Sequence, residues 1–178
     1  MLFFGNRADP TAKVARAVRR FLAPDETVLA GLHVQRPGTA AAELSGAVRG
    51  AVAGAVGNTT FVPGGASDPK TNEWLKHVGE LGIDPKLAQR TLRMHFVLTD
   101  RRFLLIRRSR LTGRVREMLA AWPLSGLERI RVHRGSRDLR LTIAGVDDLR
   151  LELPNDHRFL PEAYREVPKR LAAARKAL

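Results

Sequence analysis

The chain has 178 residues, 44% of them hydrophobic, which is enough for one sizeable core and short for two. It contains no cysteine, which excludes disulfides, thiolate zinc sites and cysteine nucleophiles and favours an intracellular protein. The net charge of +13 and pI of 11.4 favour polyanionic partners, although a generically basic, arginine-rich composition is the alternative. The opening residues do not have the form of a secretory signal, and no run of about 18 apolar residues predicts a membrane span.

The segment 1–23 is predicted to hold a basic amphipathic helix. Asp9 is a candidate N-cap, and Pro10 suits the first helical position because that position needs no amide donor. Apolar side chains recur at helical spacing and basic ones occupy the other faces: Val14, Val18, Phe21 and Leu22 against Lys13, Arg16, Arg19 and Arg20. Two interpretations stay open: the helix lies on an anionic membrane, or its apolar face packs on the rest of the domain.

Residues 28–34 alternate in polarity and predict a strand that Pro37-Gly38 ends. The segment 38–90 differs in composition and is predicted to be an insertion between the first and second strands. Its first part is rich in Ala and Gly, with Gly46, Gly50 and Gly54 spaced by four, which fits either close helix packing or a mobile, partly helical surface segment. Short helices are expected at 71–78 and from Asp84-Pro85 onward. Residues 38–70 are expected to be the least regular part and dispensable for folding.

From residue 91 to 153 the polarity alternates with a period of two, and turn residues separate the runs. This pattern predicts an antiparallel meander of short strands with one buried face. The predicted core of this region comprises Phe96, Leu98, Ile130, Leu139, Leu141, Leu149 and Leu151. Residues 156–178 repeat apolar side chains at threes and fours and predict a C-terminal helix, kinked at Pro168.

The stretch HFVLTDRRFLLIRR, residues 95–108, places four polar residues between two apolar runs. Thr99 to Arg102 are predicted to form a tight turn between antiparallel strands. In that turn Asp100 accepts hydrogen bonds from nearby backbone amides, and the arginines flank a solvated tip.

Three motifs carry a resemblance to a known family: DETVLA at 25–30, LTDRRFL at 98–104 and WPLSGLERI at 122–130. With the order of elements around them, they make the chain resemble the bacterial pleckstrin-homology-like domains, which are related to PH and GRAM domains. The resemblance covers residues 24–178 less the insertion. It implies one α+β domain over 1–178, with a strongly bent antiparallel sheet or barrel that the C-terminal helix closes. The long segment 38–90 departs from the short loop that this fold usually has there.

Bacterial members of this family are mostly without assigned activity, and fold alone does not settle function. The residues of this chain indicate no catalytic site. In eukaryotic PH domains the loop between the first two strands often binds phosphoinositide headgroups through basic residues. No basic cluster in 38–90 matches such a motif. The resemblance therefore assigns no headgroup-binding residue to this chain. His33, His77, His95, His133 and His157 lack the spacing of metal ligands on one helix face. No phosphate loop or nucleophile elbow is present. We therefore expect no enzyme, no cofactor and no metal.

Two arginine clusters are the candidate binding residues for an anion or a partner. The first surrounds the turn at Gly113 and comprises Arg107, Arg108, Arg110, Arg114 and Arg116. The second comprises Arg129, Arg131, Arg140 and Arg150, which project from the outer faces of neighbouring predicted strands and would merge into one strip. An ordinary solvated outer face is the alternative for both.

These observations favour a non-enzymatic interaction module that binds a protein partner or an anionic membrane surface. Such a module would be cytoplasmic, with peripheral association at the inner membrane face. Nucleic-acid binding is the alternative function that the charge permits. It has less support because aromatic residues are only 6% of the chain and do not form a base-stacking pattern.

Overall fold

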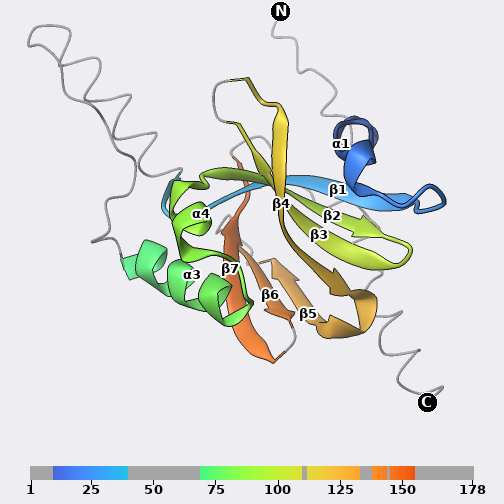
Figure 1. Cartoon of the computed structure of the whole chain (residues 1–178). Coiled ribbons are helices and arrows are strands. Elements are labelled where there is room, and N and C mark those ends of the chain that lie inside the picture. The colour runs from blue at the N-terminus through green and yellow to red at the C-terminus, as the bar shows by residue number, and fades with distance from the viewer. Residues whose placement is uncertain (1–9, 40–68, 110–111, 133–137, 144, 155–178) are drawn as a thin grey trace, which may run out of the picture.

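A computed structural model describes residues 10–39, 69–109, 112–132, 138–143 and 145–154 of the chain. This part is α+β, with a seven-stranded antiparallel sheet and a few short helices (Figure 1). In chain order the elements are α1 (Thr11–Val18), the 3-10 turn η1 (Arg19–Phe21), β1 (Val28–Gln35), α3 (Pro69–Glu80), α4 (Pro85–Arg90), β2 (Arg93–Thr99), β3 (Arg102–Arg108), β4 (Val115–Pro123), the 3-10 turn η2 (Leu124–Gly126), β5 (Leu127–Val132), β6 (Asp138–Ile143) and β7 (Val146–Glu152).

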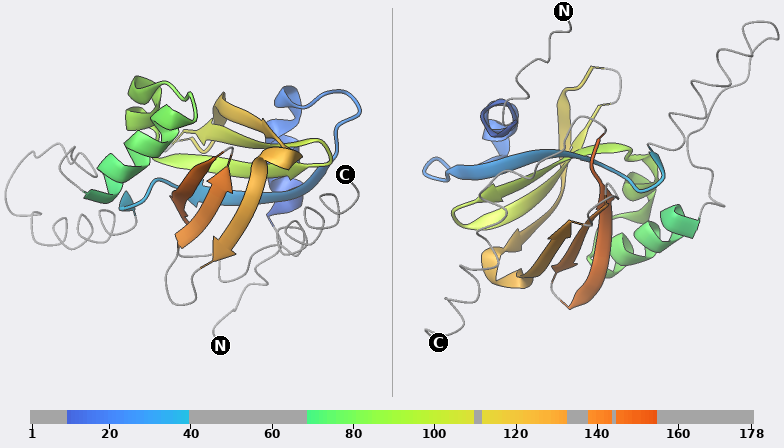
Figure 2. Two further views of the ribbon diagram at one scale, coloured as in Figure 1. Left: turned by 90° about the horizontal axis from the view of Figure 1, so that it is seen from below. Right: turned by 180° about the vertical axis from the view of Figure 1, so that it is seen from behind.

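The strands follow the order β4-β3-β2-β1-β7-β6-β5, so β4 and β5 are the edges of the sheet. The two halves of the sheet, β1–β4 and β5–β7, meet where Gln35 of β1 pairs with Glu152 of β7. The sheet bends there, and the halves lie in different planes with their inner faces toward each other (Figures 1 and 2). Gly113 lies in its predicted turn, and Gly145 lies in the turn between β6 and β7. Their φ values of +67° and +80° are a backbone conformation that glycine adopts without strain.

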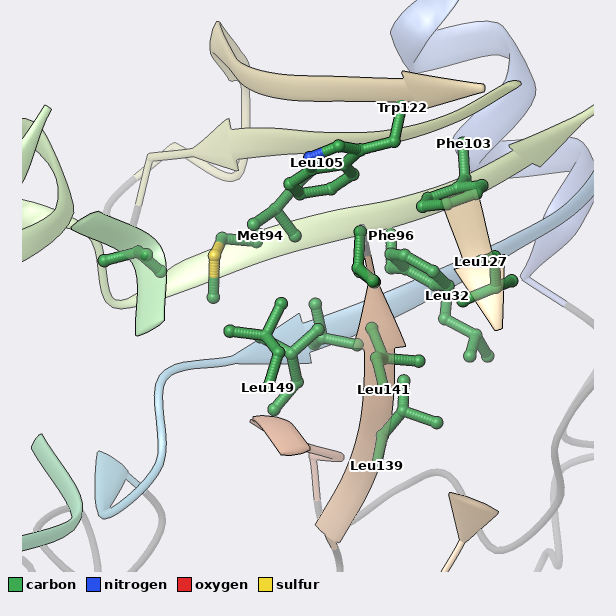
Figure 3. Close-up of a cluster of buried hydrophobic side chains, with 14 of the residues drawn as sticks. Leu32, Met94, Phe96, Phe103, Leu105, Trp122, Leu127, Leu139, Leu141 and Leu149 are labelled. Carbon is green, nitrogen blue, oxygen red and sulfur yellow. The ribbon is translucent and has the colours of Figure 1, made fainter. Parts of the chain in front are cut away.

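The main core fills the space between the two halves of the sheet (Figure 3). Leu32, Phe96 and Phe103 come from one half, and they share this cluster with Leu139 and Leu141 from the other. Of the predicted core residues Ile130 is only partly buried, whereas the other six are buried. The alternating polarity of the β6 and β7 sequences therefore correctly predicted which of their side chains face the core.

The prediction of a single buried face is wrong for β2 and β3. Helix α1 lies on the side of the β1–β4 half that faces away from β5–β7 (Figure 1). There Val14 and Val18 form a second core cluster with Val97, Leu104 and Ile106. Because β2 and β3 are covered on both sides, each contains a continuous apolar run, residues 96–98 in β2 and 103–106 in β3, as is typical of strands buried on both faces.

Of the two interpretations of the N-terminal helix, the structure has the one in which it packs on its own domain. The helix begins at Thr11, one residue later than expected, with Pro10 as its N-cap. The approach to β1 is close: a Cβ added at Gly31 would lie 2.7 Å from Val14. Asp9 and the residues before it lie outside the described ranges.

The second part of the segment 38–90 belongs to the core. Helices α3 and α4 appear at the two predicted places, and the Asp84 carboxylate caps α4 by accepting a hydrogen bond from the Lys86 amide at 2.9 Å. Trp74 and Val78 are buried in the main cluster. These helices are thus part of the domain and not a surface addition. Residues 40–68 and the predicted C-terminal helix 156–178 lie outside the described ranges.

The polar turn between β2 and β3 is tied to the start of β1. The Asp100 carboxylate accepts a hydrogen bond from the Thr27 amide at 3.0 Å, and the Asp100 amide donates to the Thr27 carbonyl at 3.0 Å. Beside them the buried Glu26 carboxylate accepts from Nε and Nη2 of Arg102, both at 2.8 Å, and from the Thr99 hydroxyl at 2.8 Å. The motifs at 25–30 and 98–104 are therefore two sides of one structural contact.

Candidate anion-binding surface

The hairpin between β3 and β4 carries the first predicted arginine cluster, whose members differ in what they contact. Arg107 pairs with Glu117 at 3.2 Å. Arg108 turns inward, where its Nε donates to the Gly113 carbonyl at 3.1 Å. Burial, and then the nearby charge of Arg93, lower the pKa of Arg108.

Two members of this cluster, Arg114 and Arg116, extend into solvent. The side chains of Arg114 and Arg116 are exposed, and neither makes an ion pair within the described part of the chain. Arg110 lies outside that part.

The structure brings a second group of arginines to this hairpin. The exposed Arg20 of η1 reaches β4, and its Nη2 donates to the carbonyls of Val115 at 2.9 Å and Arg116 at 2.6 Å. Exposed Arg16 and Arg19 flank it along α1 and η1, and neither forms an ion pair with any described residue. We call Arg16, Arg19, Arg20, Arg114 and Arg116 the basic surface. The sequence holds no signal for it, because α1 and the hairpin meet only in the folded chain.

The second predicted cluster forms a row across β5, β6 and β7. Arg131 is opposite Arg140, and Arg140 is opposite Arg150, while Arg129 is opposite Thr142. Acidic neighbours compensate much of its charge: Arg140 pairs with Asp148 and Arg150 pairs with Asp138.

The pKa of Arg150 shows the same compensation. The hydrogen bond that Arg150 donates to Asp138 raises this pKa, and the charges of Asp138, Glu73 and Glu152 raise it further, against the effect of burial. Only Arg129 and Arg131 of the row are exposed. The row is therefore a weaker anion-binding candidate than the basic surface.

Two histidines on neighbouring strands, far apart in the sequence, are in contact. His33 of β1 and His95 of β2 are opposite each other in register, and their Nδ1 atoms lie 3.0 Å apart.

Within the described ranges no group of three or more histidine, aspartate or glutamate side chains is placed to hold a metal ion. Among the described helices, none is both long and apolar enough to cross a membrane. Comparisons of the chain with protein-family models, curated proteins and solved structures give no match.

Proposed function

We propose that this chain is a non-enzymatic module of PH-like fold that binds anionic membranes through the basic surface. The fold part of the proposal is supported by the sheet, in which β1–β4 and β5–β7 form separate halves. It is also supported by the contact between the motifs at 25–30 and 98–104, and by the third motif, which forms the β4–β5 connection. In this proposal residues 156–178 form the closing helix, and 38–90 expand the connection between β1 and β2.

The observation that carries the functional part is the joining of two basic segments. Arg20 lies 96 residues before Arg116 in the chain, and its side chain bonds directly to that residue's backbone. Because the arginines of the basic surface are exposed and form no ion pair with any residue that the structure describes, their fields add on one side of the molecule. Near an anionic bilayer each basic residue contributes about 1 kcal/mol, and this falls off within a Debye length of about 8–10 Å.

The surroundings of the basic surface favour a membrane over nucleic acid. Met118 of β4 is 41% exposed, and among the described residues it is the only large hydrophobic side chain that is exposed. An unbranched apolar side chain beside arginines suits the boundary between headgroups and acyl chains. A strand of bases would instead need exposed aromatic rings on which to stack, and the described surface has none. The proposed location is cytoplasmic, with peripheral association at the inner membrane face.

The test compares two variants of equal net charge. The first replaces four residues of the basic surface by Gln: Arg16, Arg19, Arg114 and Arg116. The control replaces four exposed basic residues elsewhere: Lys86, Arg90, Arg129 and Arg131. Each set lowers the charge from +13 to +9, so a difference between them reports position and not total charge. Arg107 and Arg108 are left intact because Arg107 already pairs with Glu117 and Arg108 already donates to the Gly113 carbonyl.

Binding is measured by co-sedimentation with phosphatidylserine-containing vesicles at low salt. At about 1 kcal/mol per residue, loss of four arginines weakens binding up to about 1000-fold, while the control variant binds close to the parent. Equal loss in the two variants would mean that only total charge matters and would reject the basic surface. Retention on an acidic protein column, with no vesicle binding at any salt, would point to a protein partner instead.

A further inference from the structure

Two strands of the sheet have a neighbour on one side only. Within the part of the chain that the structure describes, β4 pairs with β3 and β5 pairs with β6. Such an edge presents backbone amides and carbonyls to a further strand. On β4 the register shifts twice, and Nη2 of Arg20 donates to the carbonyls of Val115 and Arg116. These features make β4 a poor template for an added strand.

The edge of β5 is more regular. Figure 1 shows β5 as the outermost strand of the β5–β7 half. Its register shifts once, near Leu127, and residues 129–132 then follow β6 one by one. The β5 edge is therefore the better template for a further strand.

The two faces of β5 differ in chemistry. Ile130 is opposite the buried Leu141 and packs, partly buried, against the main core cluster. Arg129 and Arg131 flank Ile130 in the sequence, so they face the other way, where Arg131 is opposite Arg140. Both flanking arginines are exposed, and neither forms an ion pair with a described residue. The edge thus offers an apolar side chain on its inner face and two cations on its outer face.

The inner strands of this half show how the sheet accommodates outward-facing arginines. Arg140 of β6 pairs with Asp148 of β7, and Arg150 of β7 pairs with Asp138 of β6. In both cases the carboxylate comes from the neighbouring strand, two residues before the residue that is opposite the arginine. On β5 the residue opposite Arg131 is Arg140, a like charge that opposes it. The matching carboxylate for Arg131 would therefore come from a strand on the free side of β5.

A second copy of this chain does not supply such a strand. Two β5 strands related by a two-fold axis pair antiparallel, and residues opposite each other share a face of the sheet. Registers centred on residue 129, 130 or 131 then place arginine opposite arginine. Like charges in that position are destabilising. The β5 edge therefore disfavours its own copy and favours an acidic strand.

We propose that the free edge of β5 is a docking site for an extended acidic segment of a partner protein, in which Asp or Glu alternates with apolar residues. The segment adds a strand to the sheet through backbone hydrogen bonds. Its carboxylates lie beside Arg129 and Arg131 on the outer face, and an apolar residue beside Ile130 extends the core. This site is separate from the basic surface and does not depend on the proposed function.

Fluorescence anisotropy with synthetic peptides and the full chain, without lipid, tests the site. The probe is a labelled peptide of alternating Glu and Val with blocked ends, and it should bind. A peptide of the same composition, with its glutamates and valines in separate blocks, should bind more weakly because it does not match both faces of β5. The alternating peptide N-methylated along its central residues keeps its charge but cannot donate backbone hydrogen bonds, and it should not bind. Absence of binding by the alternating peptide, or equal binding of all three, would overturn the proposal.

Two variants of equal net charge test the position of the site. The first is Arg129→Gln with Arg131→Gln, and the control is Arg16→Gln with Arg19→Gln. Each lowers the charge from +13 to +11. The first variant should lose up to about 30-fold in affinity for the alternating peptide, the effect of two opposite-charge cross-strand pairs, while the control binds like the parent. Equal affinities of the two variants would show attraction to total charge and overturn the site.

Amide hydrogen exchange locates the peptide on the parent chain, and so remains decisive if a variant does not fold. The alternating peptide should raise the protection of amides within residues 128–131 of β5 and leave residues 117–121 of β4 unchanged. Protection gained in β4 and not in β5 would place the peptide on the other edge and overturn the proposal. Because no lipid is present, failure here leaves membrane binding by the basic surface untouched.

Discussion

Replacing Glu26 by Gln tests the contact that joins the start of β1 to the β2–β3 turn. The Glu26 side chain is 1% exposed and accepts four hydrogen bonds, from Arg102 Nε and Nη2, the Thr99 hydroxyl and the Ala23 amide. The variant keeps the shape of the side chain but removes its charge. Arg102 then loses the anion that faces it, and the Phe21 carbonyl remains one of its acceptors.

The pKa of Glu26 gives the expected magnitude. The hydrogen bonds from Arg102 lower it most, burial opposes them, and the Ala23 amide and Thr99 hydroxyl lower it further, from 4.5 to about 2. At about 1.4 kcal/mol per pKa unit, the charged form stabilises the fold by about 3 kcal/mol at pH 7. Because the folded-state pKa is the lower one, this contribution is complete above pH 4.5 and is lost toward pH 2. About 1.4 kcal/mol remains at pH 3.

The assay is urea unfolding followed by the fluorescence of the buried Trp74 and Trp122. At pH 7 Glu26→Gln should lower the free energy of unfolding by about 3 kcal/mol, and at pH 3 by about half of that. The exposed Glu128→Gln is the control, with an expected change within about 0.5 kcal/mol. A cost below about 1 kcal/mol at pH 7, or a cost that does not shrink with acid, would refute the reasoning.

Three further predictions concern stability. Leu141→Ala, in the core between the sheet halves, should cost about 2–5 kcal/mol in the same urea assay, and a smaller loss would place Leu141 outside the core. Gly31→Ala should displace α1 at a cost of about 1–3 kcal/mol, and Val14→Ala in the same chain should recover part of it if contact with Val14 is the cause. Replacing 40–68 by a short glycine-serine linker should keep cooperative unfolding, whereas extending the deletion through 90 should abolish it because Trp74 and Val78 leave the core.

The fold elements that the sequence predicts well are those with a local signal. Leu139 and Leu141 alternate with polar residues because one face of β6 is buried and the other is solvated. The helix start at Asp84-Pro85 is likewise visible from two adjacent residues. The continuous apolar run of β3 is a different case. It is typical of a strand covered on both faces, but its second cover is α1, whose position depends on tertiary packing.

Which arginines remain available to a partner is not visible in the sequence. Arg140 and Asp148 come from adjacent strands, and the register between those strands decides that they meet. Arg108 turns inward on its own hairpin, although its neighbours in the sequence are equally basic. His33 and His95 lie 62 residues apart, and only strand pairing brings them into contact. Tertiary structure therefore determines which arginines pair with carboxylates, and so which arginines remain for the candidate site.

The central claim, that the basic surface faces the membrane, is tested most directly with single fluorescent labels. The chain has no cysteine, so Arg114→Cys and Arg131→Cys each give one labelling site, on the hairpin and on the row across β5–β7. An environment-sensitive dye at 114 should shift to shorter wavelength when phosphatidylserine vesicles are added at low salt, while the dye at 131 should not change. Equal shifts at both sites, or a shift at 131 alone, would contradict the account.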